Sequence, residues 1–585
     1  MQEKVVDIYE FGPFRLDTVE RRLLRDDGPV TLTPKLFDML LLLVQRKGHL
    51  VTKEELRRRI WPEQFIGENN LTVRMSALRK ALGDGLGGNR YIETVPGDGY
   101  RFIARVKAVE QSLDPPMTEA AGVHRTRINA LAVLPFVNES VDPELEYLSD
   151  GVTDSIINSL SQLSNLRVIA RSTVFSFKGD ENDPVEAGRK LGVDVVLAGR
   201  VSRLGDKLVV GVELVDVRDS TQVWGETYNQ LFSDLLEVQE QIARKISEKL
   251  SLRLTNEEMR QLVKQPTTNV EAYHVYLKGH YFWNKRTVKG INTGIKHFEE
   301  AIKLDATYAL AYVGLANCYR GLAVWNVLPP NEAFPLSKRY VSKALEIDGS
   351  LAEAYASLAI IELYNYNWIA AEKIFKVSIE LNPGYATARQ WYSLCLASTG
   401  QMDEAIAVAK LAQNTDPLSI NIRVQLGRIY YFMRQYEKAI EQCDEAIEID
   451  PSFAPAHGIK GLAYVLMERY ESAILALHKA ADFMEGDPEG IALLGYAYGK
   501  CGRRREALAA VAELKARSKQ RYTPPYLLAY VYSGLKEKGK AFEWLDNACS
   551  EHCFTLSLLK VDPIYDCLRS DARFSALLRR VGLIP

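Results

Sequence analysis

The chain has 585 residues, of which 47% are hydrophobic and 25% are charged, and its formal net charge is -2. This length exceeds one hydrophobic core, and the balanced composition excludes a disordered polyelectrolyte or a protein that is basic throughout. No apolar run approaches the roughly 20 residues of a membrane span, and the first residues lack the apolar core of a secretory signal. We therefore expect a soluble, cytoplasmic protein of several domains that does not contact a membrane.

Residues 1–106 alternate short strands with capped helices. Strands are predicted at residues 9–11, 14–17, 22–25 and 30–32. A first helix starts at Pro34 after the cap residue Thr33, and Gly48 ends it. A second helix over residues 53–60 opens with a T-x-x-E capping box formed by Thr52 and Glu55.

A third helix and a hairpin complete this region. Asn69 or Asn70 is expected to cap the helix, and Gly83 closes it. Apolar residues fall on one side of its helical wheel, and small or polar residues fall on the other. Strands at residues 91–95 and 100–103 flank a tight turn and predict a wing. This order of elements predicts a winged helix-turn-helix.

The wheel of the third helix supplies candidate DNA-binding side chains. Its outer arc carries basic, hydroxyl and small apolar side chains, which can bond guanine, reach other base edges or pack on a thymine methyl group. Arg79 lies nearer the core side and is assigned to a phosphate contact or to an internal ion pair. The candidate set is Asn70, Thr72, Val73, Arg74, Ser76, Ala77, Arg79 and Lys80 on the helix, with Thr94 and Arg101 on the wing strands.

The strings LTVRMSALRKALGD and YIETVPGDGYRF, with the elements around them, resemble the OmpR/PhoB-type winged-helix domain over residues 8–106. The VPGxGYRF wing is most similar to the CadC/ToxR-like branch. The resemblance implies that the third helix enters the major groove of DNA and that the wing touches the adjacent backbone or minor groove. Ala77 and Pro96 depart from residues common in response regulators, so the preferred DNA sequence cannot be transferred. No receiver domain precedes these residues, so we do not expect phosphorelay control.

Residues 107–128 contain Pro115, Pro116 and small residues without apolar periodicity, which predicts a linker. Residues 129–256 then alternate strand-like and helical segments, which predicts an α/β domain. The segments LAVLPFVNES, GVDVVLAGRV and TQVWGETYNQ resemble the TolB-N-like domain. That resemblance implies an architecture rather than an activity. A packed spacer or a dimerisation domain is favoured over a ligand pocket, because no convergent polar cluster can be named from the sequence.

Residues 269–585 carry a repeat of 34 residues. Small residues stand at this interval through six units, and prolines close three of them. The pattern resembles the tetratricopeptide repeat, and two looser units upstream bring the count to about eight. The resemblance implies an α-solenoid whose concave face grips a peptide or partner protein. The positions concerned are Ala371, Ala405, Ala439, Ala473, Ala507 and Ala541, with Pro383, Pro417 and Pro451.

Catalytic and metal-binding motifs are missing from the sequence. Residues 83–88 fit GxGxxG, but they follow a helix and precede a strand, the reverse of a dinucleotide-binding turn. The seven cysteines include no CxxC pair, and the histidines have no metal-ligand spacing. We therefore expect no enzyme activity, no cofactor and no metal.

The predicted fold is multidomain, with a winged helix-turn-helix, an α/β TolB-N-like domain and an all-α solenoid of tetratricopeptide repeats. The predicted function is a bacterial, sequence-specific DNA-binding transcriptional regulator whose repeats bind a protein partner or relay a signal. A homodimer could form on double-stranded DNA. The alternative is an interaction scaffold in which the winged helix makes protein contacts instead of binding DNA.

Overall fold

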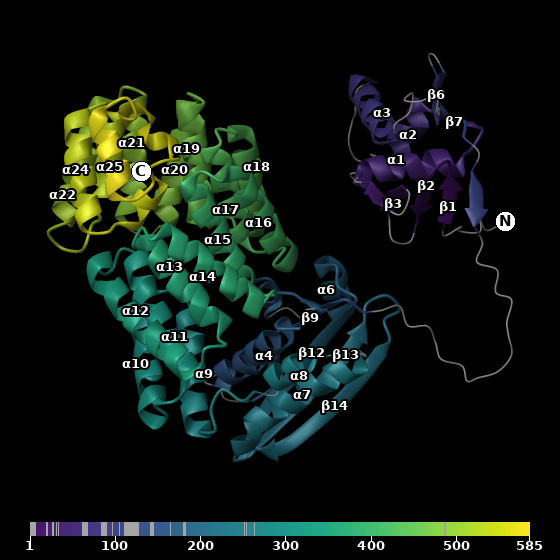
Figure 1. The fold of residues 1–585 in the computed structure, drawn as a ribbon, viewed down its shortest axis with the longest axis horizontal. Coiled ribbons are helices and arrows are strands. Elements are labelled where there is room, and N and C mark those ends of the chain that lie inside the picture. The colour runs from purple at the N-terminus through teal and green to yellow at the C-terminus, as the bar shows by residue number, and fades with distance from the viewer. Residues whose placement is uncertain are drawn as a thin grey trace. The chain divides into compact units, whose positions relative to one another are not determined.

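The chain folds into two compact units, Met1–Val123 and His124–Pro585, drawn from purple to yellow in Figure 1. The structure, a computed structural model, describes residues 8–18, 22–25, 28–30, 32, 34–60, 68–82, 91–95, 98–104, 106–109, 128–140, 145–163, 165–179, 183–250, 252, 254–262, 264–484 and 487–584. No helix in these described ranges is long and apolar enough to cross a membrane.

The first unit is a small α/β domain with two sheets and three helices. Five strands pair in the order β4-β3-β2-β1-β8, and three pair in the order β5-β7-β6. The strands are β1 (Ile8–Phe11), β2 (Phe14–Asp17), β3 (Arg22–Arg25), β4 (Gly28–Val30), β5 (Leu50–Thr52), β6 (Ile92–Val95), β7 (Gly99–Phe102) and β8 (Lys107–Val109). The helices are α1 (Pro34–Gln45), α2 (Lys53–Ile60) and α3 (Glu68–Leu82).

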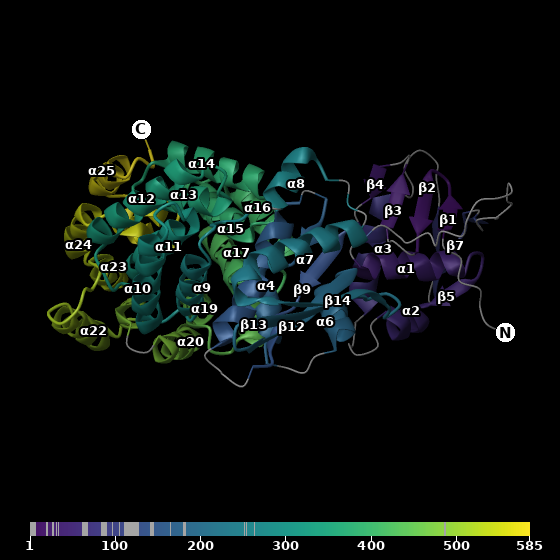
Figure 2. The same ribbon diagram turned by 90° about the horizontal axis from the view of Figure 1, so that it is seen from below.

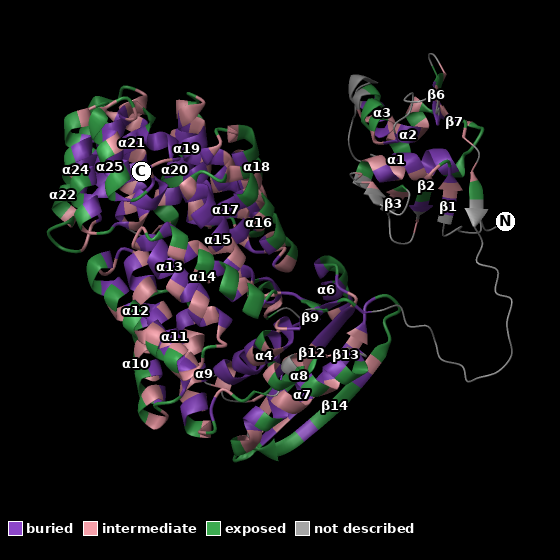
Figure 3. Cartoon of the chain, in the orientation of Figure 1, coloured by how far each residue is buried: buried purple, intermediate pink, exposed green. Residues whose placement is uncertain are grey.

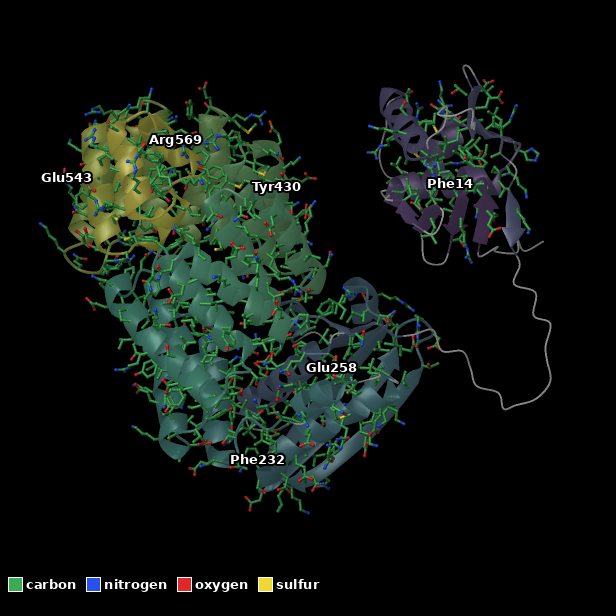
Figure 4. All side chains as sticks on the ribbon, in the orientation of Figure 1. Phe14, Phe232, Glu258, Tyr430, Glu543 and Arg569 are labelled. Carbon is green, nitrogen blue, oxygen red and sulfur yellow. The ribbon has the colours of Figure 1, made fainter. Side chains whose placement is uncertain are left out.

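Aromatic rings from separate strands form the centre of this domain. The ring of Phe11 lies 5.1 Å from that of Phe102 and 5.5 Å from that of Phe14, and Tyr91 packs edge-on against Phe14. Phe14 is labelled in Figure 4. Such edge-to-face pairs add stabilisation beyond the burial of apolar area. The apolar sides of α1, α2 and α3 close over this cluster.

Several boundaries of the first unit differ from the sequence-based predictions. The fourth strand is Gly28–Val30 rather than residues 30–32, because Gly28 is the residue that pairs with Arg25 of β3. Strand β5 was not predicted, since three residues show no periodicity. Helix α3 begins at Glu68, so Asn69 and Asn70 lie within it and do not cap it. Thr33, Gly83 and Pro96 lie outside the described residues.

The predicted linker also begins inside the first sheet. Strand β8 pairs antiparallel with β1, with Ala108 opposite Tyr9. Its three residues are therefore part of the domain and not of the linker.

The second unit opens with a mixed sheet. Strands follow the order β11-β9-β12-β13-β14, with β10 also paired to β12, and α4 and α7 pack against them. The strands are β9 (Ala130–Val133), β10 (Val137–Asn138), β11 (Arg167–Val168), β12 (Val195–Leu204), β13 (Lys207–Asp216) and β14 (Gln222–Leu231). The helices are α4 (Glu146–Ser161), α5 (Arg171–Val174), η2 (Phe175–Phe177), α6 (Pro184–Leu191), η3 (Phe232–Asp234), α7 (Leu235–Lys249) and α8 (Asn256–Leu262).

Helices α9 to α24 follow as eight consecutive pairs, which confirms the repeat count (Figures 1 and 2). They are α9 (Val270–Asn284), α10 (Val288–Leu304), α11 (Ala309–Val324), α12 (Pro330–Ile347), α13 (Ala352–Tyr364), α14 (Trp368–Leu381), α15 (Ala386–Thr399), α16 (Met402–Thr415), α17 (Ile420–Phe432), α18 (Tyr436–Ile449), α19 (Ala454–Leu466), α20 (Tyr470–Phe483), α21 (Pro488–Lys500), α22 (Arg504–Arg517), α23 (Tyr526–Gly534) and α24 (Lys538–Ser550). The chain ends with η4 (Phe554–Leu558), η5 (Pro563–Leu568) and α25 (Ala572–Arg580).

The 34-residue period is the spacing of close helix contacts. Each of the six periodic alanines, on α14, α16, α18, α20, α22 and α24, is fully buried. A larger side chain there would separate the paired helices, because interiors are packed without spare volume. The small residues of the repeat therefore allow the paired helices to pack closely.

The turn inside each repeat uses the left-handed backbone region at the same interval. Residues with positive φ at this turn are Tyr366, Gly400, Arg434, Glu468, Gly502 and Lys536. Only two of these six are glycines, although the left-handed region costs an ordinary residue about 1–2 kcal/mol. Four turns therefore store strain that their surroundings maintain.

The C-terminal segment fills the inner side of the solenoid. Its η4 and η5 helices contact the first helices of several repeats, α13, α15 and α23. The hydroxyl of Tyr431 on α17 donates to Asp562 at 3.2 Å, and Trp368 donates from Nε1 to the carbonyl of Val581 at 2.8 Å. Leu556, Leu559 and other apolar residues of this segment are fully buried.

The position of the C-terminal segment bears on the expected use of the concave face. A peptide partner was expected to lie against the first helices of the repeats, but the chain's own C-terminal residues lie against several of them. Burial of a single apolar side chain is worth about 1.5–3 kcal/mol, so displacing this segment would be costly. The parts of the first helices that the C-terminal segment covers are therefore not open to a partner.

Two substitutions at the left-handed turns should change the stability of the solenoid in opposite directions. Replacing Gly502 with alanine should destabilise the solenoid by about 1 kcal/mol, because the added Cβ contacts nothing and only backbone strain changes. Glu468→Gly should stabilise it by about 0.5–1 kcal/mol. Urea denaturation of the full chain, followed by far-ultraviolet circular dichroism, compares the two midpoints with that of the parent. Shifts in the same direction would contradict this account.

Candidate DNA-binding site

Helix α3 presents a buried side and an exposed side, as the wheel predicted. Leu71, Met75, Leu78 and Leu82 are buried in the domain core. On the outer side, Thr72, Ser76, Ala77 and Lys80 are exposed. Figure 3 shows green exposed segments along α3. Four of the candidate residues therefore share one accessible surface.

Three other candidates on α3 differ from this group. Arg74 is half-buried at the edge of the exposed side. Asn70 and Val73 are residues of α3 whose side chains lie outside the described part of the structure.

Lys80 makes no hydrogen bond or ion pair with the described residues, so its ammonium group faces solvent.

Arg79 connects α3 to the wing. Its guanidinium donates to the carbonyl of Ile92 at 3.0 Å and to the hydroxyl of Thr94 at 2.7 Å, and it lies 5.9 Å from the ring centre of Tyr100. Two candidate residues, Arg79 and Thr94, therefore bond to each other. The geometry gives Arg79 a role in holding the wing strands against the helix.

The wing strands are fixed by a further ion pair and by one glycine. Arg101 on β7 lies 3.2 Å from the carboxylate of Glu93 on β6. At Gly99, a Cβ atom would overlap the backbone of Val51 and Thr52 on β5. The glycine of the predicted wing turn therefore allows β5 and β7 to pair closely. Arg101 keeps part of its surface exposed next to this hairpin.

Helix α2 is also held at both of its ends. The backbone N–H of Glu55 donates to Oγ1 of Thr52 at 3.1 Å, which confirms this bond of the predicted capping box. Lys35 donates from Nζ to the carbonyl of Ile60 at 2.6 Å and so satisfies an end group of the helix.

The end of α2 contains basic residues that the site prediction omitted. Its last turn carries Arg57, Arg58 and Arg59, and Arg58 is exposed. A run of three arginines was the available signal. The candidate residues were taken from the third helix and the wing alone, so this run was not among them.

The described residues hold no group of three or more histidine, cysteine, aspartate or glutamate side chains arranged to bind a metal. All seven cysteines are free thiols, and five of them are buried. Burial raises the pKa of the Cys443 thiol to about 12, so this group stays protonated.

Three family models match the chain in sequence order. Residues 27–102 match "Transcriptional regulatory protein, C terminal", which describes the OmpR/PhoB-type domain. Residues 127–247 match "HilA/YgeH-like transcriptional regulator, second domain", and residues 421–453 match "Tetratricopeptide repeat". The second match covers the domain that was predicted on its TolB-N-like resemblance.

Individual proteins with similar sequences span different parts of the chain. Transcriptional regulator HilA of Salmonella typhimurium is 25% identical over 452 residues, 75% of this chain and 76% of the relative. Putative adenylate cyclase 3 of Rhizobium meliloti is 30% identical over 40% of this chain and 33% of its own length. The solved DNA-binding domain of Escherichia coli CadC is 26% identical and covers 18% of this chain and 97% of that domain, with a TM-score of 0.17.

The roles of neighbouring residues 79 and 80 can be separated by substitution. Arg79→Met should lower the stability of the first unit by about 1–2 kcal/mol, because two hydrogen bonds to the wing are lost. Lys80→Met should leave stability unchanged, since this side chain faces solvent. Calorimetry of the full chain measures both. An unchanged transition for Arg79→Met would contradict its role in holding the wing.

Proposed function

We propose that this chain, a transcriptional regulator with an OmpR/PhoB-type DNA-binding domain, a HilA-like second domain and tetratricopeptide repeats, reads DNA through the exposed side of α3. The observation that carries this assignment is the shared exposure of Thr72, Ser76, Ala77 and Lys80 on the helix that follows α2. Hydroxyl, methyl and ammonium groups on one helix side suit base edges and thymine methyl groups.

The wing supplies the second contact surface in this proposal. Arg79 and Thr94 position β6 against α3, and Arg101 lies on the neighbouring strand β7, opposite Glu93. Arg101 would reach a phosphate, and the exposed Arg58 on α2 would add to the positive field. Contacts with phosphates fix the register of a protein on the duplex, whereas contacts with base edges select the sequence.

A protein partner is proposed for the outer surface of the repeats. Exposed apolar side chains lie on the second helices of repeats, including Ile369 on α14, Leu411 on α16 and Leu475 on α20. Leu381, Ile449 and Phe483 are also exposed at equivalent positions of three repeats. Apolar side chains at a recurring position of a solenoid favour a protein contact over isolated surface exposure.

The assembly and location of the protein belong to the same proposal. We expect it to act in the bacterial cytoplasm, where promoter DNA is accessible, and to have no catalytic activity. A homodimer on two half-sites is consistent with winged-helix recognition.

The DNA-binding assignment is tested with a control variant that also removes a positive charge. The double variant Arg74→Ala/Lys80→Ala should bind genomic fragments selected by the parent at least about tenfold more weakly, since one good base contact is worth about 1–3 kcal/mol. Arg15→Ala removes an exposed charge from β2 and should retain affinity. Fluorescence anisotropy over a series of salt concentrations measures binding and its salt slope.

The outcome also separates the two candidate functions. If the parent chain enriches genomic DNA no more than the double variant of α3 does, α3 does not read DNA. The winged helix is then a platform for protein contacts. If the double variant and Arg15→Ala bind DNA equally well, DNA is read by another surface.

A further inference from the structure

A cavity lies where the second domain meets the first repeats. Its volume is about 1000 Å³ when the part open to solvent is included. Helix α4 forms one wall, and α9 with the N-terminal end of α13 forms the other. The residues between α8 and α9 close a third side, at Lys264 and Pro266. Segments from both regions of the second unit are therefore needed to form it.

The walls of the cavity are held together by buried contacts. Tyr273 on α9 donates to Oε1 of Gln239 on α7 at 2.7 Å. Gly151 on α4 packs against Leu277 so closely that a Cβ atom would lie 2.8 Å from its methyl groups. Asp416, between α16 and α17, accepts bonds from the hydroxyls of Ser172 and Thr173 on α5. The cavity is preformed, which lowers the cost of binding a ligand.

More contacts hold the same junction at its edge. Phe232, labelled in Figure 4, lies 4.6 Å ring to ring from His274 of α9 and 4.1 Å beneath the guanidinium of Arg203. The hydroxyl of Tyr147 on α4 bonds to the ring of the same histidine. Burial and the nearby cations lower the pKa of His274 to about 4, so this histidine is neutral near pH 7.

Two of the three carboxylates that line the cavity have cationic partners. Asp154 lies 2.6 Å from Nε of Arg171 and 3.1 Å from Nδ1 of His280. Asp348 lies 2.7 Å from Nζ of Lys264. These pairs satisfy the rule that a carboxylate removed from water needs a cation or hydrogen-bond donors.

The third carboxylate, Glu353 in the first turn of α13, lacks such a partner. No lysine or arginine of the described chain forms an ion pair with it. Burial, with Asp348 nearby, raises the pKa of its carboxyl group. Its own backbone N–H donates to it, and the other groups that act on it are His280 and Tyr276 of α9 and Tyr385 before α15. Only His280 among these can offer a positive charge.

We propose that this cavity binds a small ligand carrying a protonated amine or a guanidinium, with Glu353 as its ion-pair partner. The cation would pair with the one carboxylate of the cavity that has no ion pair with the described residues. The ring of Tyr276 lines the cavity close to Glu353 and provides an aromatic face, which attracts cations. Polar side chains at the opposite wall offer hydrogen bonds, including Asn158 of α4 and Gln162, which follows this helix.

The ligand would bridge α4 of the second domain and α13 of the solenoid. Because it would bind only the folded and docked unit, it should stabilise that unit in proportion to its concentration. The same cavity should exclude anions, since three carboxylates line it against one lysine and one histidine.

The test uses the full chain and probes of matched size. Isothermal titration calorimetry and thermal unfolding are measured with 1,4-diaminobutane, agmatine and benzylamine. The controls are 1,4-butanediol, which is neutral, and succinate, which is anionic. We expect at least one amine or guanidinium probe to bind at millimolar concentration and to raise the unfolding temperature, and we expect neither control to do so.

Two variants assign the binding to the cavity. Glu353→Gln should weaken binding at least tenfold, whereas Glu346→Gln, at an exposed residue of α12, should leave it unchanged. Asn158→Trp adds bulk at an exposed position of the rim and should block binding without altering Glu353. This second substitution keeps the proposal testable if Glu353→Gln disturbs folding.

The pH dependence provides a separate readout. Glu353 must be ionised to pair with a cation, and burial raises the pKa of its carboxyl group. Affinity should therefore rise as the pH increases through that pKa, with proton release on binding. The pH dependence should disappear in Glu353→Gln.

Three results would overturn the proposal. These are failure of every amine and guanidinium probe to bind the parent chain, equal binding of succinate, and binding that persists unchanged in both Glu353→Gln and Asn158→Trp. None of them involves DNA, so the assignment of α3 would be unaffected by such a failure.

Discussion

The buried junction between the second domain and the first repeat is the constraint on which the second unit depends. Tyr273, Leu277 and Tyr308 from the repeats belong to the same apolar core as Val152 and Ile156 of α4. Separating the two regions would expose this core to water, at about 25 cal/mol for each Å² of apolar surface. The second domain is therefore not a spacer that moves independently of the solenoid.

Packing at this junction also buries particular polar groups. When α4 packs against α9, Asp154 is removed from water, where it pairs with Arg171 and lies 3.1 Å from Nδ1 of His280. On the solenoid side, the approach of the connection after α8 brings Lys264 to Asp348. A convergent polar cluster thus exists where none could be named from the sequence, because its members are separated by up to several repeats along the chain.

Local patterns predicted much of the fold. The 34-residue interval identified the helix pairs, since each interval corresponds to one close contact at a buried alanine. The capping box at Thr52 and the apolar side of α3 were also predicted, because each depends on residues a few positions apart in the sequence. These predictions succeeded because the residues that determine each feature are close together in the sequence.

The predictions failed where distant segments meet. Strand β5 is defined by pairing with β7, about fifty residues later, and has no pattern of its own. The C-terminal residues around Leu556 are apolar, but only the curvature of the repeats places them on the inner side of the solenoid. The role of Arg79 likewise depends on Thr94 and Ile92, which a helical wheel cannot represent.

A comparison of two carboxylates shows why Glu353 points to a ligand and Asp562 does not. Burial raises the pKa of Asp562 to about 6, yet its oxygen accepts from the hydroxyl of Tyr431 and from the backbone N–H of Ile564. Those donors come from the chain, so Asp562 is explained by the packing of the C-terminal segment. Glu353 faces a cavity, and its neighbours include another carboxylate. The chain provides the cavity and the negative charge, and a cation from solution would compensate that charge.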